Sequence, residues 1–357
     1  MHKYKMSSAK ERSFPIDFLR CLGAVVVMLA HTDPPAWLFQ LRNFGTPLLI
    51  VVAALSAALV YRDRPLLTWA FLKRRCIKLT VPPWLFLSMF FGVAFVYSSL
   101  RGNPFPFSNE VVFGSYSFSS GIGYVWIFKV YLIIALLTPG LLRFRKTVND
   151  AKTYFMILLV SYLLCELVGV LVHENVHSPW LVELLNDTLL TVPPYAVLFA
   201  YGLWLGELAE WQVAATSLAS LLVFVALSVL KFKQLGHFVP TQLFKYPPTL
   251  YFLSYSFFCL NALYLFAKSA LAARVPARPV AWVSANLLWI FLWHIMGIFV
   301  WGWVAGTPHG RLGMSLLMLA FVFGFGASVT WLQTRVVAAL LPQAPGEPKN
   351  PLRLLFE

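Results

Sequence analysis

The chain has 357 residues, of which 59% are hydrophobic and only 12% are charged, and its mean hydropathy is +0.73. Soluble chains are about half apolar and about a quarter charged, so this composition excludes an ordinary water-soluble protein. The 28 lysines and arginines outnumber the 14 acidic residues. Such an excess is typical either of nucleic-acid binding or of membrane topology, and its distribution along the chain decides between the two.

The apolar residues are grouped in blocks of about twenty, the length of a helix that crosses about 30 Å of hydrocarbon. Helices satisfy their own backbone hydrogen bonds in lipid, and the short alternating segments of a membrane barrel are not seen. The first block lacks a small-residue cleavage site, so we expect it to remain as the first span. We predict an all-α, polytopic transmembrane bundle of about ten helices, from the apolar segments at residues 16–36, 44–61, 78–99, 123–142, 153–173, 189–207, 212–230, 249–267, 281–303 and 312–333.

The basic residues gather in alternate loops between these segments. If the N-terminus is cytoplasmic, most of the 28 fall in cytoplasmic loops, as is typical of membrane proteins. The even number of spans then places the C-terminus on the same side. The basic excess is therefore mostly a topology signal, and we predict a multi-pass protein of the cytoplasmic (inner) membrane, surrounded by membrane lipids and with no nucleic-acid partner. The exceptions on the predicted outer side are Arg42, Arg101, Lys231, Lys233, Lys245 and Arg311.

The domain organisation is simple. We predict one transmembrane domain over residues 1–335 and a cytoplasmic tail over residues 336–357. Proline, glycine and charge are enriched from Pro342 to Pro351, which predicts disorder in the tail. The four cysteines are scattered without a Cys-x-x-Cys spacing, so neither a metal site nor a disulfide framework is indicated. The absence of a Walker motif and of His-Glu-x-x-His argues against an ATP-driven pump and a zinc protease.

Three ionisable residues share one face of the first predicted span. Ten residues lie between Arg20 and His31. The eleven steps bring the helix round to nearly the same direction about 16 Å further along its axis. Asp17 lies one turn before Arg20, a spacing that predicts an ion pair. Ionisable groups within a span are costly and usually face a cavity or a partner.

Two interpretations of these residues compete. Asp17 and Arg20 could be headgroup anchors at the inner interface, and His31 an interfacial histidine near the outer end. Their common face favours a functional role. A histidine that accepts a proton near neutral pH suits general-base work. His31 could deprotonate a hydroxyl for attack on an acyl thioester, or it could carry the acyl group itself.

The Arg-x10-His spacing, within Asp-Phe-Leu-Arg-Cys-Leu-Gly-Ala-Val-Val-Val-Met-Leu-Ala-His, resembles the signature of the membrane acyltransferase-3 family. Members of that family move acyl groups, often acetyl, from a cytoplasmic acyl-CoA to sugars or other acceptors, many of them extracytoplasmic glycans. The resemblance implies that His31, Arg20 and Asp17 are catalytic.

A second basic cluster, formed by Arg74, Arg75 and Lys78, leads into the third predicted span. Helical spacing lets these side chains converge, and such a cluster suits the phosphates of a nucleotide-like donor. Its other interpretation is positive-inside topology and contact with anionic lipid. The family carries an Arg-Arg-x-x-Arg motif here that is linked to donor binding, so the resemblance implies a role for all three residues in binding acyl-CoA. Lys78 in the last place keeps the charge but lacks the planar fork of arginine.

Two further residues are possible members of a secondary site. His294 lies in an aromatic-rich apolar run, and the family often ends a late helix with such a segment and a histidine. It is either an active-site residue or a buried histidine bonded to a neighbouring helix. Glu166 lies within another apolar run, where a carboxylate needs a partner or a proton. It either lines an acceptor cavity or bridges two helices.

Together, the residues and the resemblance predict a membrane-bound O-acyltransferase. Acyl-CoA, with acetyl-CoA as the first candidate, would be the donor, and a glycan or lipid-linked sugar the acceptor. No metal is required. The main alternative is a secondary transporter of a polar or lipidic solute, in which the same charges form a substrate or proton path. The absence of a detectable inverted repeat argues against it. A non-catalytic membrane scaffold is the third possibility.

Overall fold

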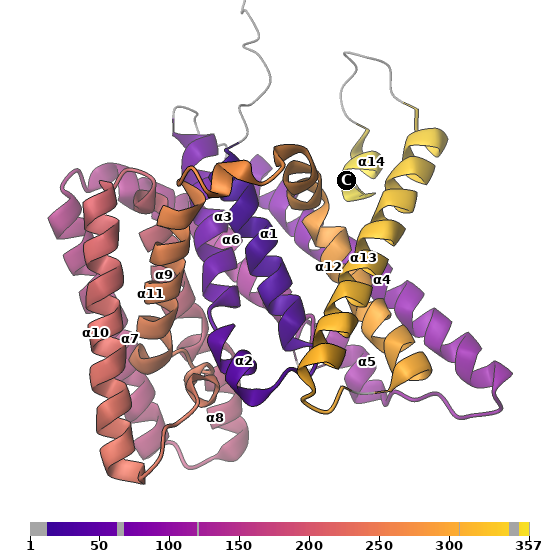
Figure 1. The fold of residues 1–357 in the computed structure, drawn as a ribbon, viewed down its shortest axis with the longest axis horizontal. Helices are drawn as coiled ribbons and strands as arrows, with labels where there is room; N and C mark the ends of the chain where they lie inside the picture. Colours follow the sequence, from indigo (N-terminus) through magenta and orange to yellow (C-terminus); the bar gives the residue numbers. More distant parts are fainter. Residues whose placement is uncertain (1–12, 63–67, 120, 307, 343–349, 357) are drawn as a thin grey trace, which may run out of the picture.

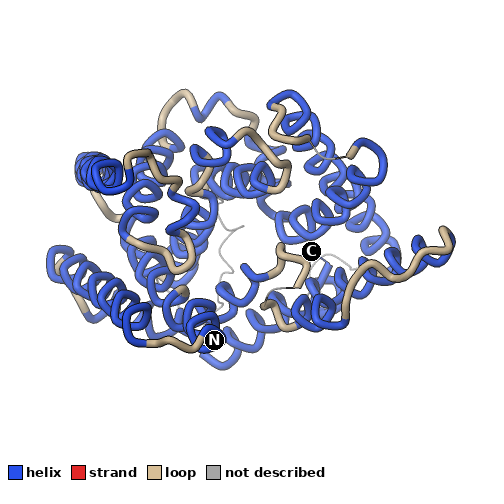
Figure 2. The backbone as a smooth tube through the Cα atoms, turned by 90° about the horizontal axis from the view of Figure 1, so that it is seen from below, coloured by secondary structure: helices blue, strands red, loops and turns tan. Residues whose placement is uncertain are grey.

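The computed structural model describes residues 13–62, 68–119, 121–306, 308–342 and 350–356. These residues form helices and connecting turns, without a strand (Figures 1 and 2). The helices are α1 (Phe14–Ala30), α2 (Ala36–Leu41), α3 (Gly45–Tyr61), α4 (Thr68–Leu100), α5 (Asn109–Tyr116), α6 (Trp126–Thr147), α7 (Ala151–Asn175), α8 (Pro179–Leu185), the π-helical turn η1 (Asn186–Leu190), α9 (Val192–Leu205), α10 (Glu210–Leu235), the 3-10 turn η2 (Thr241–Phe244), α11 (Leu250–Ala267), the 3-10 turn η3 (Ala272–Arg274), α12 (Ala277–Ala305), α13 (Leu312–Leu340) and α14 (Pro351–Phe356).

Each of the ten predicted segments corresponds to a helix. Eight stretches in the described part of the chain are long and apolar enough to cross a membrane, with α2 and α3 counted together as one of them. The other two, α1 and α9, have 17 and 14 residues. The prediction of an all-α polytopic bundle is therefore confirmed.

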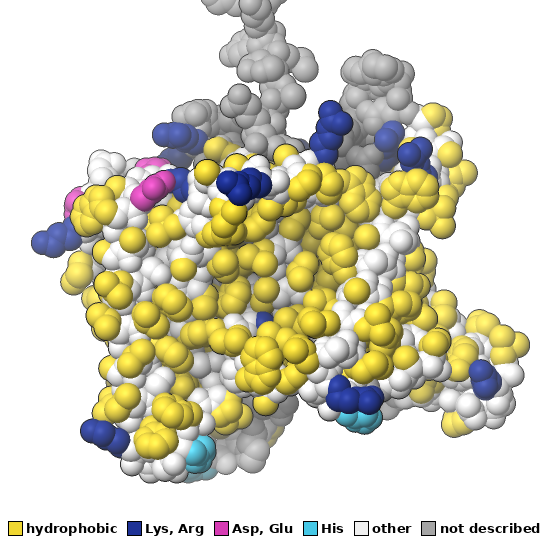
Figure 3. Space-filling view, viewed as in Figure 1, with side chains coloured by type: hydrophobic (Ala, Val, Ile, Leu, Met, Phe, Trp, Pro, Cys, Tyr) yellow, Lys and Arg dark blue, Asp and Glu magenta, His cyan; other side chains and the backbone are white. Residues whose placement is uncertain are grey.

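The surface has the character expected of a protein in lipid. On the face shown in Figure 3, hydrophobic side chains cover the middle of the molecule and charged side chains gather toward its two ends. Helices α7 and α10 expose rows of large apolar side chains, such as Leu159 and Leu163 on α7 and Leu218 and Leu222 on α10. Apolar patches of this extent are not tolerated in water, so these helices are placed to face lipid.

Two boundaries differ from the sequence prediction, each for a local reason. The first span was predicted to reach residue 36, but α1 ends at Ala30 and the chain turns before the Pro34–Pro35 pair. Proline lacks an amide hydrogen and disfavours helix in the residue before it, which separates α1 from α2. Helix α4 begins at Thr68, ten residues before the predicted start. The prediction missed its first turns because they are charged. The basic cluster therefore lies within α4.

The centre of the bundle is packed through small residues. Helix α9 crosses α3 so closely that a Cβ added at Gly202 would lie 2.7 Å from the Cβ of Ala54. Helix α13 approaches α12 in the same way, since a Cβ at Gly326 would lie 2.7 Å from the carbonyl oxygen of Ile290. Close backbone approach is how helices gain packing energy in lipid. It fixes α3 and α12, the two helices between which α1 packs.

The C-terminal region differs in part from the predicted tail. Residues 343–349 lie outside the described residues. However, α13 continues to Leu340, and Pro351–Phe356 form the short helix α14. The side chain of Trp289 on α12 donates a 3.0 Å hydrogen bond to the carbonyl of Leu355 and stacks on Phe356 at 5.7 Å. The carbonyl of Leu355 and the ring of Phe356 thus hold residues 351–356 against α12.

Candidate active site

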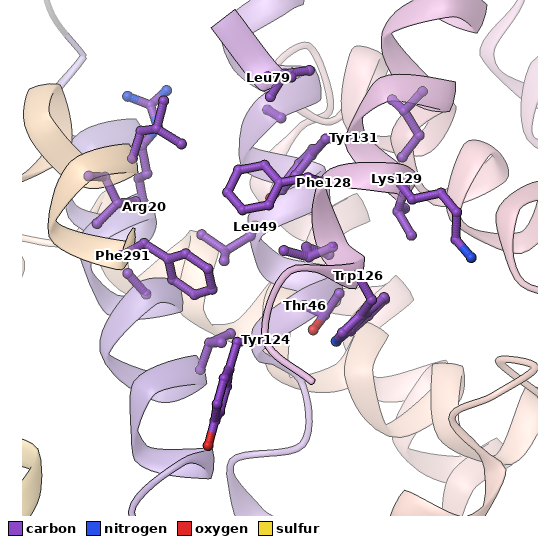
Figure 4. A pocket seen from close by; sticks show the side chains of 18 of the residues that line it. Arg20, Thr46, Leu49, Leu79, Tyr124, Trp126, Phe128, Lys129, Tyr131 and Phe291 are labelled. Carbon is purple, nitrogen blue, oxygen red and sulfur yellow. The ribbon is translucent and has the colours of Figure 1, made fainter. Parts of the chain in front are cut away.

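One cavity of about 1430 Å³ runs through the centre of the bundle. Its wall is built by α1, α3, α4, α6 and α12 together with the segments that follow α2 and η2. It brings together four of the eight residues singled out by the sequence. Figure 4 shows part of this wall, with the rings of Phe128 and Phe291 lying between Arg20 and Tyr124. The four predicted residues on the wall are Arg20, His31, Arg75 and Lys78.

Arg20 is held by residues of three helices. Its guanidinium forms the predicted ion pair with Asp17, at 3.5 Å, and donates hydrogen bonds to Ser284 on α12 at 2.8 Å and to Ser56 on α3 at 2.5 Å. The hydroxyl of Ser284 in turn donates to the buried carboxylate of Asp17 at 2.5 Å. The charge of Arg20 is therefore balanced within the protein, and its direction is fixed by α1, α3 and α12.

His31 caps the C-terminal end of α1 and contacts a second histidine. Its Nδ1 lies 3.0 Å from Nε2 of His294, and the two rings stack with centroids 5.3 Å apart. The edge of Tyr124 packs against His31 at 4.7 Å. His294 is fully buried on α12 and does not line the cavity. The sequence left its role open, and the structure places it directly behind His31.

The hydrogen bonds of this pair define which nitrogen of His31 is free to act as a base. Nδ1 of His294 bonds to the carbonyl oxygen of Phe291, which can only accept, so this nitrogen carries a proton. In the neutral ring, Nε2 of His294 is then an acceptor and receives the proton of His31 Nδ1. The remaining nitrogen of His31, Nε2, consequently has a lone pair in the tautomer that this network favours.

Two cations to which the sequence pattern assigns no role line the same cavity. Arg42, which follows α2, is 6% exposed, and Lys245, which follows η2, is 7% exposed. The charge of each acts on His31. Both were among the exceptions to the distribution of basic residues, and that exception was the signal available in the sequence. The positions of Arg42 and Lys245 are explained by the cavity that they line and not by membrane topology.

Burial leaves Lys245 in an unusual electrostatic state. Desolvation lowers the pKa of its ammonium from 10.5 to about 7, and the nearby charge of Arg42 acts in the same direction. Burial also raises the pKa of the phenols of Tyr124 and Tyr246, which line the same region of the cavity. These tyrosines stay neutral, so they can donate hydrogen bonds but cannot balance the cations.

The basic cluster of α4 is only partly turned toward the cavity. Arg75 and Lys78 line it, and Arg75 lies 5.6 Å from the ring of Phe71. Arg74 is exposed, as Arg75 and Lys78 are, but it is not on the cavity wall. Arg353 of α14 adds a further cation from the other end of the sequence. Because α14 packs against α4, we group Arg353 with Arg75 and Lys78 as the basic part of the wall and call it the α4 end of the cavity.

Comparison with known proteins identifies the family. A family model described as an acyltransferase domain, that of the acyltransferase-3 family, matches residues 15–333. The chain belongs to the acyltransferase-3 family. The match covers α1 through most of α13 and so includes Asp17, Arg20, His31 and His294. The searches of curated proteins and of solved structures found no match.

This acyltransferase-3 protein is therefore a multi-pass membrane acyltransferase. Its cavity offers an imidazole at His31, cations at the α4 end, and a wall of apolar and polar side chains. These are the elements needed to hold a polar, phosphate-bearing group at one place and to act on a hydroxyl at another. In the described part of the chain, no group of three or more His, Cys, Asp and Glu residues is placed to hold a metal ion.

Glu166 lies elsewhere in this acyltransferase-3 bundle. It accepts hydrogen bonds from the hydroxyl of Tyr162 at 2.5 Å and from the backbone amide of Leu250. Leu250 is the first residue of α11, whose amide has no partner within the helix. Glu166 therefore links α7 to the start of α11. Its position matches the helix-bridging alternative, because it is not on the cavity wall.

Proposed function

We propose that this protein transfers an acyl group, with acetyl as the first candidate, from a cytoplasmic acyl-CoA to a hydroxyl of an extracytoplasmic glycan or similar acceptor. The observation that carries the proposal is that a single cavity borders both the α4 end and His31. A donor with phosphates at one end and a thioester at the other fits such a cavity. The distribution of Lys and Arg supports an orientation in the inner membrane with the α4 end toward the cytoplasm.

The residues at the α4 end would hold the phosphates of CoA. Arg75 and Arg353 offer planar forks, and Lys78 offers a point charge. The pantetheine arm would extend past Arg20 and the rings of Phe128 and Phe291 toward His31. Arg20 already has its charge balanced by Asp17, so it would guide the arm by hydrogen bonding rather than by net charge.

His31 would then act on the acceptor. Its Nε2 lone pair takes the proton of the acceptor hydroxyl as the oxygen attacks the thioester carbon. A carbon–oxygen bond forms, the carbon–sulfur bond breaks, and the proton passes from His31 to the sulfur to give free CoA. His294 holds the Nδ1 proton in place throughout. A covalent route would use the same atom, with Nε2 attacking the thioester first and the hydroxyl attacking the acyl-imidazole second.

The test uses the full-length protein purified into lipid nanodiscs, with isotopically labelled acetyl-CoA and a panel of glycans. We expect His31→Ala to lower transfer by about 100- to 10,000-fold, as for loss of a general base, while CoA binding is retained. His237→Ala is the matched control, because His237 is exposed, bonds to the nearby carbonyl of Leu235 and is not on the cavity wall. Label bound to the protein without an acceptor would identify the covalent route. Proton-coupled solute uptake into proteoliposomes of the same protein, without acyl transfer, would contradict the proposal and favour a transporter.

A further inference from the structure

The positive charge beside His31 is not balanced by the protein. Arg42 and Lys245 are both buried on the cavity wall. Among the residues that the structure describes, no carboxylate forms an ion pair with either of them. The Nε of Arg42 is buried without a hydrogen-bond partner, and the same is true of the side-chain oxygen of Gln242, another residue of the wall.

This arrangement is unfavourable in an empty site. Two like charges lie near one another in a region of low dielectric, which costs free energy both by desolvation and by repulsion. The depressed pKa of Lys245 is the direct consequence. An anion bound between the two cations would remove the repulsion and restore the charge of the lysine. A neutral hydroxyl or an apolar chain would do neither.

The two cations are held in place by a buried polar network. The hydroxyl of Thr241 on η2 accepts a 2.9 Å hydrogen bond from Asn43 and donates one of 3.2 Å to Gln40. These bonds tie the end of α2, next to Arg42, to the segment that carries Lys245. A preorganised pair of cations binds with a smaller loss of side-chain entropy than two surface lysines do.

Aromatic rings complete the site. The guanidinium of Arg42 lies over Phe39 at 3.8 Å. The ammonium of Lys245 lies 5.8 Å from the ring of Trp126 and 5.1 Å from that of Tyr246. The rings shield both cations from water while leaving them on the wall of the cavity. Shielded charges interact more strongly with an anion than exposed ones do.

We propose that Arg42 and Lys245 bind an anionic group of the acceptor, a carboxylate or a phosphate, and that the acceptor is therefore an acidic glycan. This inference rests on the proposed function and names the substrate class of the same site. Arginine presents a fork that matches both anions, and lysine adds a point charge. Because both cations lie beside His31, the hydroxyl that receives the acyl group is close to the anionic group on the acceptor.

The first experiment measures binding without catalysis. Glucuronate-containing, glucose phosphate-containing and glucose-containing oligosaccharides of the same linkage are titrated calorimetrically into the full-length protein in nanodiscs of neutral lipid. We expect at least one acidic ligand to bind about tenfold or more tightly than the neutral one, and Arg42→Gln or Lys245→Gln to remove that preference. Hydrogen bonds to charged groups support a change of this size. Lys233→Gln, at an exposed position of α10, is the matched control. The carboxylate and phosphate ligands show which anion is preferred.

The second experiment measures acyl transfer to the same acceptors. We expect the two variants to raise KM for the acidic acceptor by about tenfold or more and to leave KM for the neutral acceptor within about twofold. If they lower kcat equally for both, the cations stabilise the tetrahedral oxyanion and the inference is overturned. Equal binding of acidic and neutral ligands also overturns it. So does loss of acidic-ligand binding when the neutral lipid of the nanodisc is replaced by anionic lipid. If the unaltered protein binds the acidic ligand but binds no CoA and transfers no acyl group, the proposed function is contradicted instead.

Discussion

Arg20 and Arg42 are both arginines on the wall of one cavity, but the protein treats their charges differently. Arg20 has a carboxylate, Asp17, and two serine hydroxyls around it. Arg42 has an aromatic ring beneath it and another cation, Lys245, as its electrostatic neighbour. The first arrangement is complete within the protein, whereas the second becomes favourable when an anion is added. The balance of charge around a buried cation thus distinguishes a residue that shapes the cavity from one that receives a ligand.

The largest expected effect breaks the balanced pair. Asp17→Asn replaces the carboxylate that pairs with Arg20 by a neutral amide of the same shape. We expect the free energy of unfolding to fall by about 3 kcal/mol, the low end for buried pairs, because the Arg20 side chain is 27% exposed. Thermal unfolding in detergent measures it as a lower Tm.

Arg42→Met is expected to change the same Tm in the opposite direction or not at all. It removes an unbalanced buried charge and keeps an apolar stem over Phe39. We expect it to be neutral or stabilising in the ligand-free protein, as for other replacements of buried charge by apolar residues. Destabilisation of similar size in both variants would show that the distinction between the two arginines is wrong.

His294 lies beside His31, near the cations that lack a countercharge, and its replacement tests how strictly the His31 ring must be positioned. His294→Leu removes the acceptor for the Nδ1 proton of His31, so the ring can turn or change tautomer. We expect kcat to fall by about 10- to 100-fold, in the range for misplacement of a catalytic group, with little change in donor KM. His294→Gln should recover part of the loss, because its amide oxygen can accept the same proton. A matched control is His173→Gln, because His173 bonds to a carbonyl of its own helix and is not on the cavity wall. Unchanged kcat in His294→Leu would exclude the positioning role.

The charge of Lys245 should make acceptor binding depend on pH. Its pKa is lowered to about 7, so the charged fraction falls as the pH rises through 7. Binding of an anion requires the charged form, so affinity should weaken by about tenfold per pH unit above 7. The other titratable groups facing it are His31, Arg42 and Tyr246. The measurement is the ratio of KM for acidic and neutral acceptors between pH 6 and about 9, in which titration of His31 cancels. In Lys245→Gln the ratio should be flat, and a flat ratio in the unaltered protein would contradict the role of the lysine.

The fold was largely predictable because lipid imposes a simple constraint on sequence. The ten apolar segments are all helices, since a chain in hydrocarbon must satisfy its backbone internally. The errors lie where another effect decides. Pro34 and Pro35 end the first span early, and the charged start of α4 conceals its first turns from a search for apolar residues. Residues 351–356 form a helix because Trp289 offers them a contact that their own composition does not reveal.

The site was predictable only within a single helix. The ion pair of Asp17 and Arg20 follows from their spacing on α1, and it is confirmed. Arg42 and Lys245 are about 200 residues apart and meet through the packing of two turns, so periodicity could not relate them. The contact between His31 and His294 is also tertiary. For Arg42 and Lys245, the only sign in the sequence is that both are cations on the predicted outer side.

Adjacent arginines on α4 give the smallest and most precise test, at the end of the cavity away from His31. Consecutive residues on a helix point about 100° apart. Both side chains are exposed, but Arg75 lines the cavity and Arg74 does not. We expect Arg75→Gln to raise KM for acetyl-CoA by about fivefold to tenfold, through loss of a charged hydrogen bond. Arg74→Gln should change it by less than about twofold, as for a surface substitution. Measurement at low and high salt separates contact from general attraction, because only the latter is screened. Equal effects of the two variants that vanish at high salt would show that the cluster attracts the donor without binding it.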